Sequence, residues 1–414
     1  MTLRSRFALV IAGIVIFLIL GPGLIIFSLG YKLDLEDWKL VKTGSLMVKT
    51  EPKGAVIFID GKKSKYDTPA TVRFLIPGDY TFTIKKDKYQ DWTKRLSIQS
   101  QLVTWVNLNR DFITLFFQQP ESLGQTSLET EVLSPDMRSL VFVENGRVKR
   151  IDANNGKTDD LGENNFWNLI KTGNLQVSPN NLYYLLLYNR NLGFPTDQIA
   201  QISKIETNDN YSVWSDGKIT HAANSAGQEI SNFSGVSDFL LEGQNLWLVQ
   251  NGQFLEFNLN GKTLQTISTS VPTGANTKII RGNGQTFLVV DQTLYSLNAQ
   301  AQRIYSPVTS AHFDPNGKQL LFANGHEVFI LDPLSLQSAL ILRSTTAIQN
   351  PVINDETGYL FYSNEAKIKA IELDDRDHRN VYNLTDAKEV FLPSDNGKNL
   401  FVSGSSLLQN FQIR

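Results

Sequence analysis

The pattern of apolar and polar residues divides the chain into two kinds of sequence. Residues 7–31 contain no charged side chain and are mostly apolar, and about 20 such residues in a helix span the hydrocarbon core of a bilayer. From residue 44 onwards, apolar and polar residues tend to alternate with period two, which is typical of strands that bury one face. The pattern therefore predicts an all-β protein that carries one N-terminal transmembrane helix.

The charges beside the apolar segment predict its orientation. Arg4 and Arg6 lie immediately before it, and positive charge on this flank favours a cytoplasmic N-terminus. We therefore expect a single-pass protein of the cell membrane. Residues 1–6 would be cytoplasmic, 7–31 the anchor and 32–43 a linker, with the bulk of the chain extracytoplasmic.

A cleaved signal peptide is the alternative for the same segment. Gly21-Pro22-Gly23 could end a shorter apolar region, and Ser28-Leu29-Gly30 offers small residues at the spacing that a signal peptidase prefers. Against this, residues 24–27 are strongly apolar where a cleavage region should be polar. The segment therefore favours an anchor.

Residues 44–110 predict a small β-sandwich. Leu46, Val48 and Thr50 alternate with more exposed positions, and Tyr80, Phe82 and Ile84 repeat the pattern. Asp60-Gly61 lies between two apolar runs and predicts a hairpin turn with positive φ at both central positions.

Several short motifs in this segment resemble the PEGA domain. They are Pro52-Lys53-Gly54-Ala55 at the defining turn, Thr68-Pro69, Pro77-Gly78-Asp79-Tyr80 and Lys88-Tyr89. The resemblance implies a small β-sandwich on a surface or envelope protein, with no catalytic activity of its own.

The remaining residues, 112–414, contain a repeated unit. Each copy has a turn rich in Asp, Asn, Gly and Lys, followed by an apolar strand, as in Ser134-Pro-Asp-Met-Arg-Ser-Leu and Asp314-Pro-Asn-Gly-Lys-Gln-Leu. Aligned on the first strand residue, the copies begin at Leu140, Tyr184, Leu246, Phe287, Leu320, Leu360 and Leu400. A period of roughly 40–45 residues with several strands per copy is typical of a β-propeller blade.

These repeats are similar to the WD40-like repeats of bacterial propellers, and their number predicts about seven blades. The regular spacing fails around residues 189–220, where we expect an insertion. An apolar stretch at residues 407–413 follows the last repeat. We therefore expect an early strand at residues 112–117 to complete the last blade and close the ring.

Composition adds mainly exclusions. The chain has 39 basic and 41 acidic residues, a net charge of −2, so no concentrated basic face for nucleic acid is expected. It has no cysteine, which excludes disulfides, thiolate metal sites and cysteine nucleophiles.

No sequence pattern predicts a catalytic, cofactor-binding or metal site. The four histidines are scattered, and Asp374, Asp375 and Asp377 beside His378 suggest a solvated loop more than a metal cluster. Three tryptophans, Trp167, Trp214 and Trp247, could stack on sugar rings, although filling gaps between blades is their more common role.

Together these features predict a non-enzymatic binding or scaffold protein of the cell envelope. Its partners would be the membrane, through the N-terminal helix, and either cell-wall glycan or an envelope protein. Two alternatives stay open. One is a propeller enzyme that acts on polysaccharide, which would need acidic or histidine side chains around the central channel. The other is a structural assembly protein without a small ligand.

Overall fold

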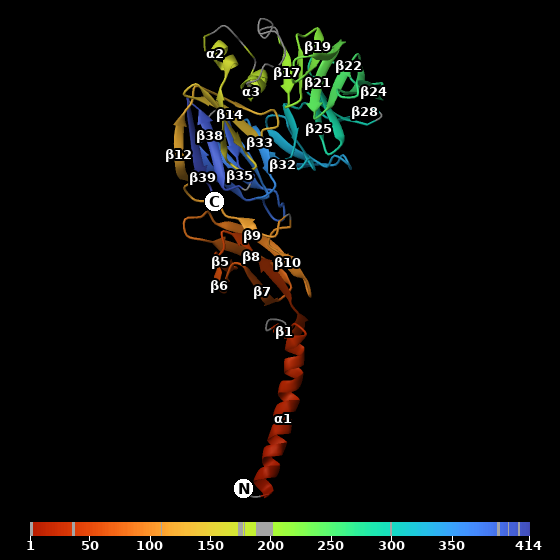
Figure 1. Ribbon diagram of the computed structural model, residues 1–414. Coiled ribbons are helices and arrows are strands. Elements are labelled where there is room, and N and C mark those ends of the chain that lie inside the picture. The colour runs from red at the N-terminus through yellow and green to blue at the C-terminus, as the bar shows by residue number, and fades with distance from the viewer. Residues whose placement is uncertain are drawn as a thin grey trace. The chain divides into compact units, whose positions relative to one another are not determined.

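The computed structural model describes residues 3–34, 38–108, 110–172, 177, 179–187, 202–298, 300–386, 390–395, 397–404 and 406–414. The chain divides into two compact units. Unit 1 comprises Met1–Gln119, Ile371–Tyr382 and Arg414, and unit 2 comprises Pro120–Ala370 and Asn383–Ile413. Figure 1 labels many of the helices and strands of both units.

Unit 1 begins with α1 (Leu3–Ser28), followed by a hairpin of β1 (Tyr31–Asp34) and β2 (Lys39–Lys42). The segment Val10–Ser28 of α1 is long and apolar enough to cross a membrane, and none of it is buried in the protein. The length and composition of this helix fit a membrane anchor or a signal sequence.

The rest of unit 1 contains two sheets that enclose one apolar core. Strand order is β10-β3-β7 in one sheet and β6-β5-β8-β9 in the other, and a short pair joins β11 to β4. The strands are β3 (Gly44–Val48), β4 (Thr50–Glu51), β5 (Val56–Ile59), β6 (Lys62–Asp67), β7 (Ala70–Leu75), β8 (Gly78–Lys85), β9 (Trp92–Ile98), β10 (Val103–Trp105) and β11 (Ile113–Thr114). This confirms the predicted β-sandwich.

The local predictions for this sandwich are also confirmed. Leu46 and Val48 of β3 and Phe82 and Ile84 of β8 are fully buried in the core, as the alternation predicts. The hairpin between β5 and β6 turns at Asp60-Gly61, whose φ angles of 47° and 75° are both positive.

Unit 1 also buries an ion cluster that includes the segment Ile371–Tyr382. The Lys94 side chain of β9 is completely buried, and its Nζ lies 3.0 Å from Glu372 Oε2 and 3.8 Å from Asp374 Oδ1. Nζ also donates to the backbone oxygen of Asp374 at 2.8 Å. The indole of Trp92 donates to Glu372 Oε1 at 3.2 Å. The segment therefore belongs to the core of the sandwich unit.

Asp374 is held from a second side by Arg376. Their closest atoms, Nη2 and Oδ2, are 2.6 Å apart, and Arg376 also donates to the backbone oxygens of Trp105 and Val106. Burial raises the pKa of Asp374, but the hydrogen bonds from Arg376 and the charge of Lys94 outweigh it and leave the pKa below its usual value. The expectation of a solvated loop is therefore wrong for Asp374, which is buried because it has two cationic partners.

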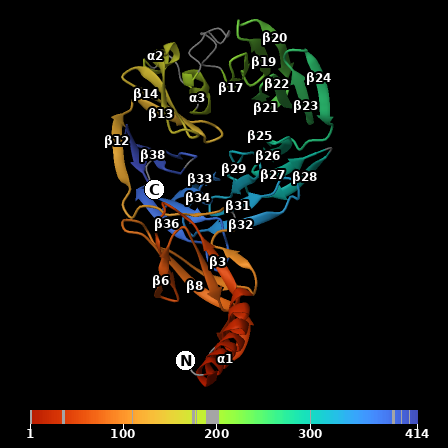
Figure 2. The same cartoon turned by 60° about the horizontal axis from the view of Figure 1, so that its bottom comes forward.

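Unit 2 is a β-propeller. Among the described residues it has seven four-stranded sheets, one of which includes residues assigned to unit 1, and Figure 2 shows the sheets arranged in a ring. Six of them are consecutive meanders. Their strands are β13 (Thr130–Leu133), β14 (Ser139–Glu144), β15 (Arg147–Asp152), β16 (Thr158–Glu163), β17 (Lys204–Thr207), β18 (Tyr211–Ser215), β19 (Ile219–Asn224), β20 (Glu229–Ser234), β21 (Val236–Glu242), β22 (Asn245–Gln250), β23 (Gln253–Asn258), β24 (Thr263–Ser268), β25 (Thr277–Gly282), β26 (Gln285–Val290), β27 (Thr293–Leu297), β28 (Ala301–Tyr305), β29 (Ser310–Phe313), β30 (Leu320–Ala323), β31 (Glu327–Leu331), β32 (Ser338–Arg343), β33 (Gln349–Asn354), β34 (Tyr359–Asn364), β35 (Lys367–Glu372) and β36 (Val381–Asp386).

The seventh sheet closes the ring with strands from both ends of unit 2. Its order is β12-β39-β38-β37, with β12 (Glu121–Ser127), β37 (Val390–Pro393), β38 (Asn399–Gly404) and β39 (Leu407–Gln412). Strand β12 runs antiparallel to β39. An early strand thus completes the last blade, but the predicted segment, residues 112–117, is wrong. Ile113 and Thr114 form β11 and pair with β4 in unit 1.

The repeated turn has a common hydrogen-bond pattern. Ser134 Oγ accepts from the backbone amides of Arg138 and Ser139, and Asp314 Oδ1 accepts from those of Lys318 and Gln319. In these two turns a short polar side chain at the first position therefore satisfies two amides before the second strand begins.

One predicted copy is a helix instead of a strand. Tyr184 lies in α3 (Pro179–Leu187), which follows α2 (Asn165–Lys171). The segment has Pro at the first helical position and no β-branched residue, both of which favour a helix. The expected insertion at 189–220 is also wrong in part, because β17, β18 and the start of β19 form a regular blade there. Residues 189–201 lie outside the described residues.

Candidate functional site

The ring of unit 2 surrounds a cavity of about 990 Å³. Its walls come from the first strands of four successive sheets, β17, β21, β25 and β29, together with α3 and the turn that contains Ser134. Ten ionisable side chains other than tyrosine line it: Asp136, Arg138, Lys204, Glu206, Asp238, Glu242, Lys278, Arg281, His312 and Asp314. The cavity is thus polar and of mixed charge.

An ion cluster on one wall joins three neighbouring blades. Lys204 Nζ of β17 lies 2.9 Å from Glu206 Oε1 and 2.7 Å from Asp238 Oδ1 of β21. The second oxygen of Glu206 accepts from the amide of Leu241, and the second oxygen of Asp238 from the amide of Ile279 in β25, each at 2.7 Å. Every carboxylate oxygen of the cluster therefore has a partner.

Burial and charge act in opposite directions in this cluster. Burial lowers the pKa of Lys204, but the charges of Glu206 and Asp238 outweigh it and raise the pKa above its usual value. For Glu206, burial is the larger effect and raises its pKa despite the ion pair with Lys204. The lysine therefore stays charged at neutral pH and ties two carboxyl groups together.

Two other side chains on the cavity wall make no hydrogen bond or ion pair with the described residues. The side chain of Lys278 in β25 is exposed to the cavity. Two effects lower the pKa of its ammonium group: the larger is desolvation by the surrounding protein, and the smaller is the like charge of Lys204. His312 of β29 is partly buried, and burial together with the charge of Lys278 lowers its pKa to about 4. At neutral pH the cavity thus offers an open cation beside a neutral imidazole.

The depressed pKa of His312 predicts a pH-dependent stability. An unfolded histidine has a pKa of about 6.5, so between pH 6.5 and 4 the unfolded chain binds more protons than the folded chain. Stability from this group should be complete above pH 6.5 and fall, by at most about 3 kcal/mol, as the pH drops to about 4. We expect His312→Gln to flatten the pH dependence of the unfolding free energy in this interval. An unchanged slope, measured by urea denaturation, would contradict the assignment.

The three tryptophans considered as sugar-stacking residues are buried. Trp214 stacks on His221, and Trp247 stacks on Phe254 and lies under the guanidinium of Arg281 at 3.4 Å. Arg281 in turn donates to Glu242 at 3.0 Å. These indoles therefore pack the blades, as gap-filling residues do, and present no free face to a ligand.

Sequence reasoning missed the cavity residues. Lys204 and Glu206 lie in the stretch interpreted as an insertion, and Lys278 lies in no motif. One signal was available in the sequence. Lys204 and Glu206 lie two residues apart in a strand-like segment, so both side chains lie on the same face of the strand. Among the described residues, no group of three or more His, Asp or Glu side chains is arranged to hold a metal ion.

Comparison with known families supports the first part of this architecture. Residues 43–111 match the family model of the PEGA domain. This match confirms the resemblance predicted for residues 44–110. None of the curated proteins matches the chain by sequence.

Solved structures that align with the chain do so at low identity. One is a chain of the mitotic checkpoint complex, with 8% identity and a TM-score of 0.41, covering 71% of this chain and 96% of that chain. Another is the extracellular domain of a putative one-component system from B. thetaiotaomicron, with 12% identity, a TM-score of 0.38, and coverage of 71% and 40%. A third is hydrazine synthase from Kuenenia stuttgartiensis, with 9% identity, a TM-score of 0.38, and coverage of 70% and 97%. The propeller fold therefore rests on the sheet topology described above.

Proposed function

We propose that this chain is a membrane-anchored, extracytoplasmic binding protein whose ring cavity receives a segment of an envelope protein. The observation that carries the proposal is the cavity, which is lined both by the exposed Lys278 and by the ion cluster of Lys204, Glu206 and Asp238. Its volume is similar to that of ligand sites, which are about 300–1,000 Å³. An acidic side chain or a terminal carboxylate would pair with Lys278.

The α1 helix and its flank support the proposed membrane location. Arg4 and Arg6 precede the apolar helix, which favours a cytoplasmic N-terminus and export of both compact units. The PEGA match adds support, since the resemblance implies a surface or envelope protein.

A polypeptide ligand is favoured over a glycan for two reasons. The cavity wall has both signs of charge, which suits a segment that carries charged side chains and backbone donors. In addition, Trp167, Trp214 and Trp247 are buried and cannot stack on a sugar ring. Cell-wall glycan therefore becomes the alternative outcome of the binding experiment.

A hydrolase acting on polysaccharide is a second candidate, because acidic and histidine side chains do line the channel. Against it, each carboxylate oxygen of Glu206 and Asp238 already has a partner within the protein, and the ion pairs with Lys204 make both groups weaker general bases. Product release from purified polysaccharide would favour this candidate.

Binding can be tested with the full chain in detergent, incubated with envelope protein extract and, separately, with purified cell wall. We expect saturable binding to a protein of the extract and a loss of about tenfold or more in affinity for Lys278→Glu, because the open cation becomes an anion. Lys218→Glu, an exposed residue outside the cavity, is the matched control and should bind normally. Binding that both variants retain equally would exclude the cavity, and binding to cell wall alone would favour the glycan.

A further inference from the structure

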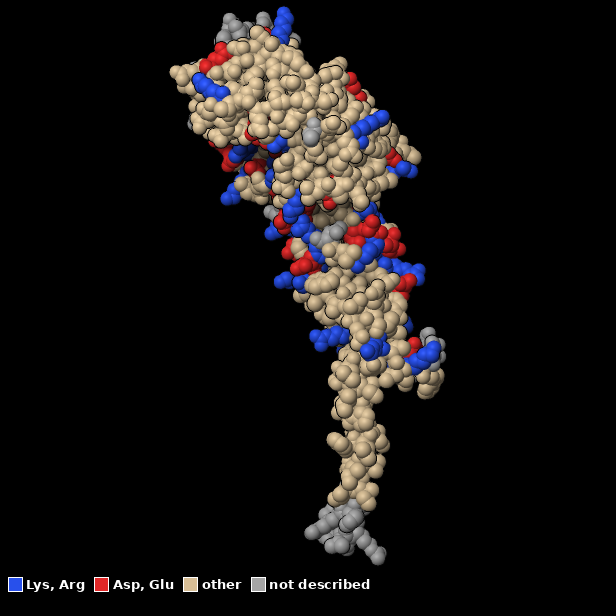
Figure 3. All heavy atoms as spheres, turned by 90° about the vertical axis from the view of Figure 1, so that its right-hand side faces the viewer, with Lys and Arg blue, Asp and Glu red and all other residues tan. Residues whose placement is uncertain are grey.

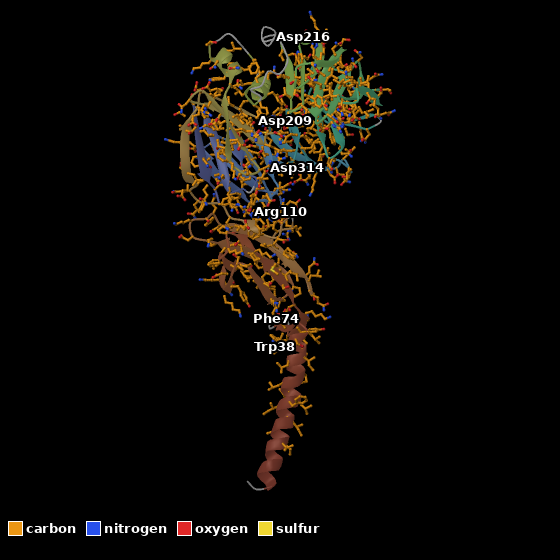
Figure 4. All side chains as sticks on the ribbon, in the orientation of Figure 1. Trp38, Phe74, Arg110, Asp209, Asp216 and Asp314 are labelled. Atoms are coloured by element: carbon orange, nitrogen blue, oxygen red, sulfur yellow. The ribbon has the colours of Figure 1, made fainter. Side chains whose placement is uncertain are left out.

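Where α1 ends, unit 1 exposes an unusual number of apolar side chains. Trp38, next to the start of β2, is 78% exposed, and Leu33 of β1 and Leu40 of β2 are 44% and 48% exposed. Figure 4 shows Trp38 and Phe74 beside the end of α1. A soluble hairpin does not gain stability from such exposure, because each apolar side chain left in water forgoes about 25 cal/mol per Å² of burial.

The sandwich contributes to the same region. The ring of Phe27 in α1 stacks on that of Phe74 in β7, with 4.7 Å between centroids. Phe74 has a φ of 60°, a left-handed conformation that is costly for a bulky residue. The residue that contacts α1 is thus held in a strained backbone conformation. Leu102 and Val103 line a surface hollow with Leu29, and all three are at least half exposed.

Six apolar residues thus surround the exit of the helix, and we call them the collar: Leu29, Leu33, Trp38, Leu40, Leu102 and Val103. Exposed cations lie among them, namely Lys32, Lys39 and Arg73, and Asp34 lies opposite Lys39 in the hairpin. In Figure 3 the surface of α1 is free of charge among the described residues, and charged side chains, basic and acidic, begin where the helix ends.

We propose that the collar lies in the interfacial layer of a bilayer with anionic headgroups, so that the hairpin and one end of the sandwich rest on the lipid surface. The membrane span ends at Ser28, three residues before β1. A strand of four residues extends about 13 Å, which is more than the thickness of the interfacial layer, about 5–8 Å on each side of the hydrocarbon core. Trp38 therefore lies in this layer when the hairpin runs along the membrane surface, and Figure 4 shows Trp38 beside the end of α1.

The composition of the collar suits that position. Tryptophan concentrates at the membrane–water boundary, where its ring is partly buried and its N–H stays hydrated. Each Lys or Arg close to an anionic surface adds about 1 kcal/mol of attraction. The inference rests on the proposed retention of α1 as an anchor, and it makes the sandwich a surface-seated module instead of a free spacer.

The absence of cysteine allows a direct depth measurement. Trp38→Cys in the full chain would carry one environment-sensitive fluorophore, reconstituted into vesicles of phosphatidylcholine and phosphatidylglycerol at about 3:1. The matched control is Asp87→Cys. Asp87 is exposed and follows the C-terminal end of β8, whereas Phe74, which contacts α1, precedes the N-terminal end of the same strand. The two labels therefore lie toward opposite ends of β8. Both sites are exposed, so neither substitution removes a core contact.

We expect the label at residue 38 to show blue-shifted emission and at least twofold stronger quenching by nitroxide lipids than the label at residue 87. Equal, water-like emission at both sites in carbonate-resistant vesicles would overturn the inference while leaving the anchor intact. Extraction of the whole chain by carbonate would instead refute the anchor itself. If the label at residue 38 shows the same emission and quenching in vesicles of pure phosphatidylcholine, the requirement for anionic lipid is overturned.

Discussion

Lys94→Met should destabilise unit 1 by about 3–5 kcal/mol, since removing one partner from a buried ion pair leaves the other charges uncompensated. The variant leaves Glu372 and Asp374 buried. Among the described residues, Arg376 is then the one cation within ion-pair distance of Asp374, and Glu372 has none. Hydrogen exchange of the β8 and β9 amides measures unit 1 separately, and a loss of this size corresponds to exchange faster by two orders of magnitude or more.

Lys85→Met is the matched control for this variant. Lys85 also pairs with a carboxylate, Asp91, but both side chains are about half exposed. Such surface pairs contribute about 0–1 kcal/mol, so the control should exchange almost normally. Adding Glu372→Gln to Lys94→Met should recover part of the loss, because one buried charge is removed. Equal effects of the two single variants would mean that the buried cluster is not important for stability.

Replacing residues 121–127 by a Gly/Ser segment of the same length should lower the unfolding midpoint of unit 2 strongly and promote aggregation. The change removes β12, whose six paired residues cover the edge of β39, and uncovered edges pair with other chains. It also releases the side chain of Thr126, which donates to Glu144 at 2.8 Å. Calorimetry and light scattering measure the two effects.

The control for the closing strand is Leu123→Ser. Leu123 lies in β12 but is half exposed, so this change should leave the midpoint within a degree or two. If the Gly/Ser variant also melts normally, ring closure by β12 makes no net contribution. The equal length of the replacement keeps the connection to β11 unchanged, so spacing cannot account for a difference.

The closing strand was predicted at the wrong residues because the prediction relied on hydrophobicity. The predicted segment, residues 112–117, is apolar because Ile113, Leu115 and Phe116 are buried in unit 1. The actual strand, β12, is polar and largely exposed, since it is the outer edge of a blade. Alternation identifies strands that bury a face, such as β3 and β8, but it gives no signal for an outer strand.

The candidate site was harder to predict than the fold. The second strands of the blades begin at or near Leu140, Leu246, Phe287, Leu320, Leu360 and Leu400, and all six residues are nearly fully buried. Their spacing therefore reveals the repeat. Lys204, Asp238 and Lys278 come together only through the ring, because they lie on three different blades and share no motif. A single sequence contains no record of that proximity.

The return of Ile371–Tyr382 into unit 1 has a consequence for biogenesis. N-terminal domains usually fold first as a chain emerges during synthesis, yet Lys94 meets Glu372 and Asp374 only after more than 270 further residues have appeared. Until then the sandwich holds a lysine destined for complete burial with no counter-charge. In the proposed topology, export of this chain therefore includes a coupled step, in which a segment delivered late completes the domain that was delivered first.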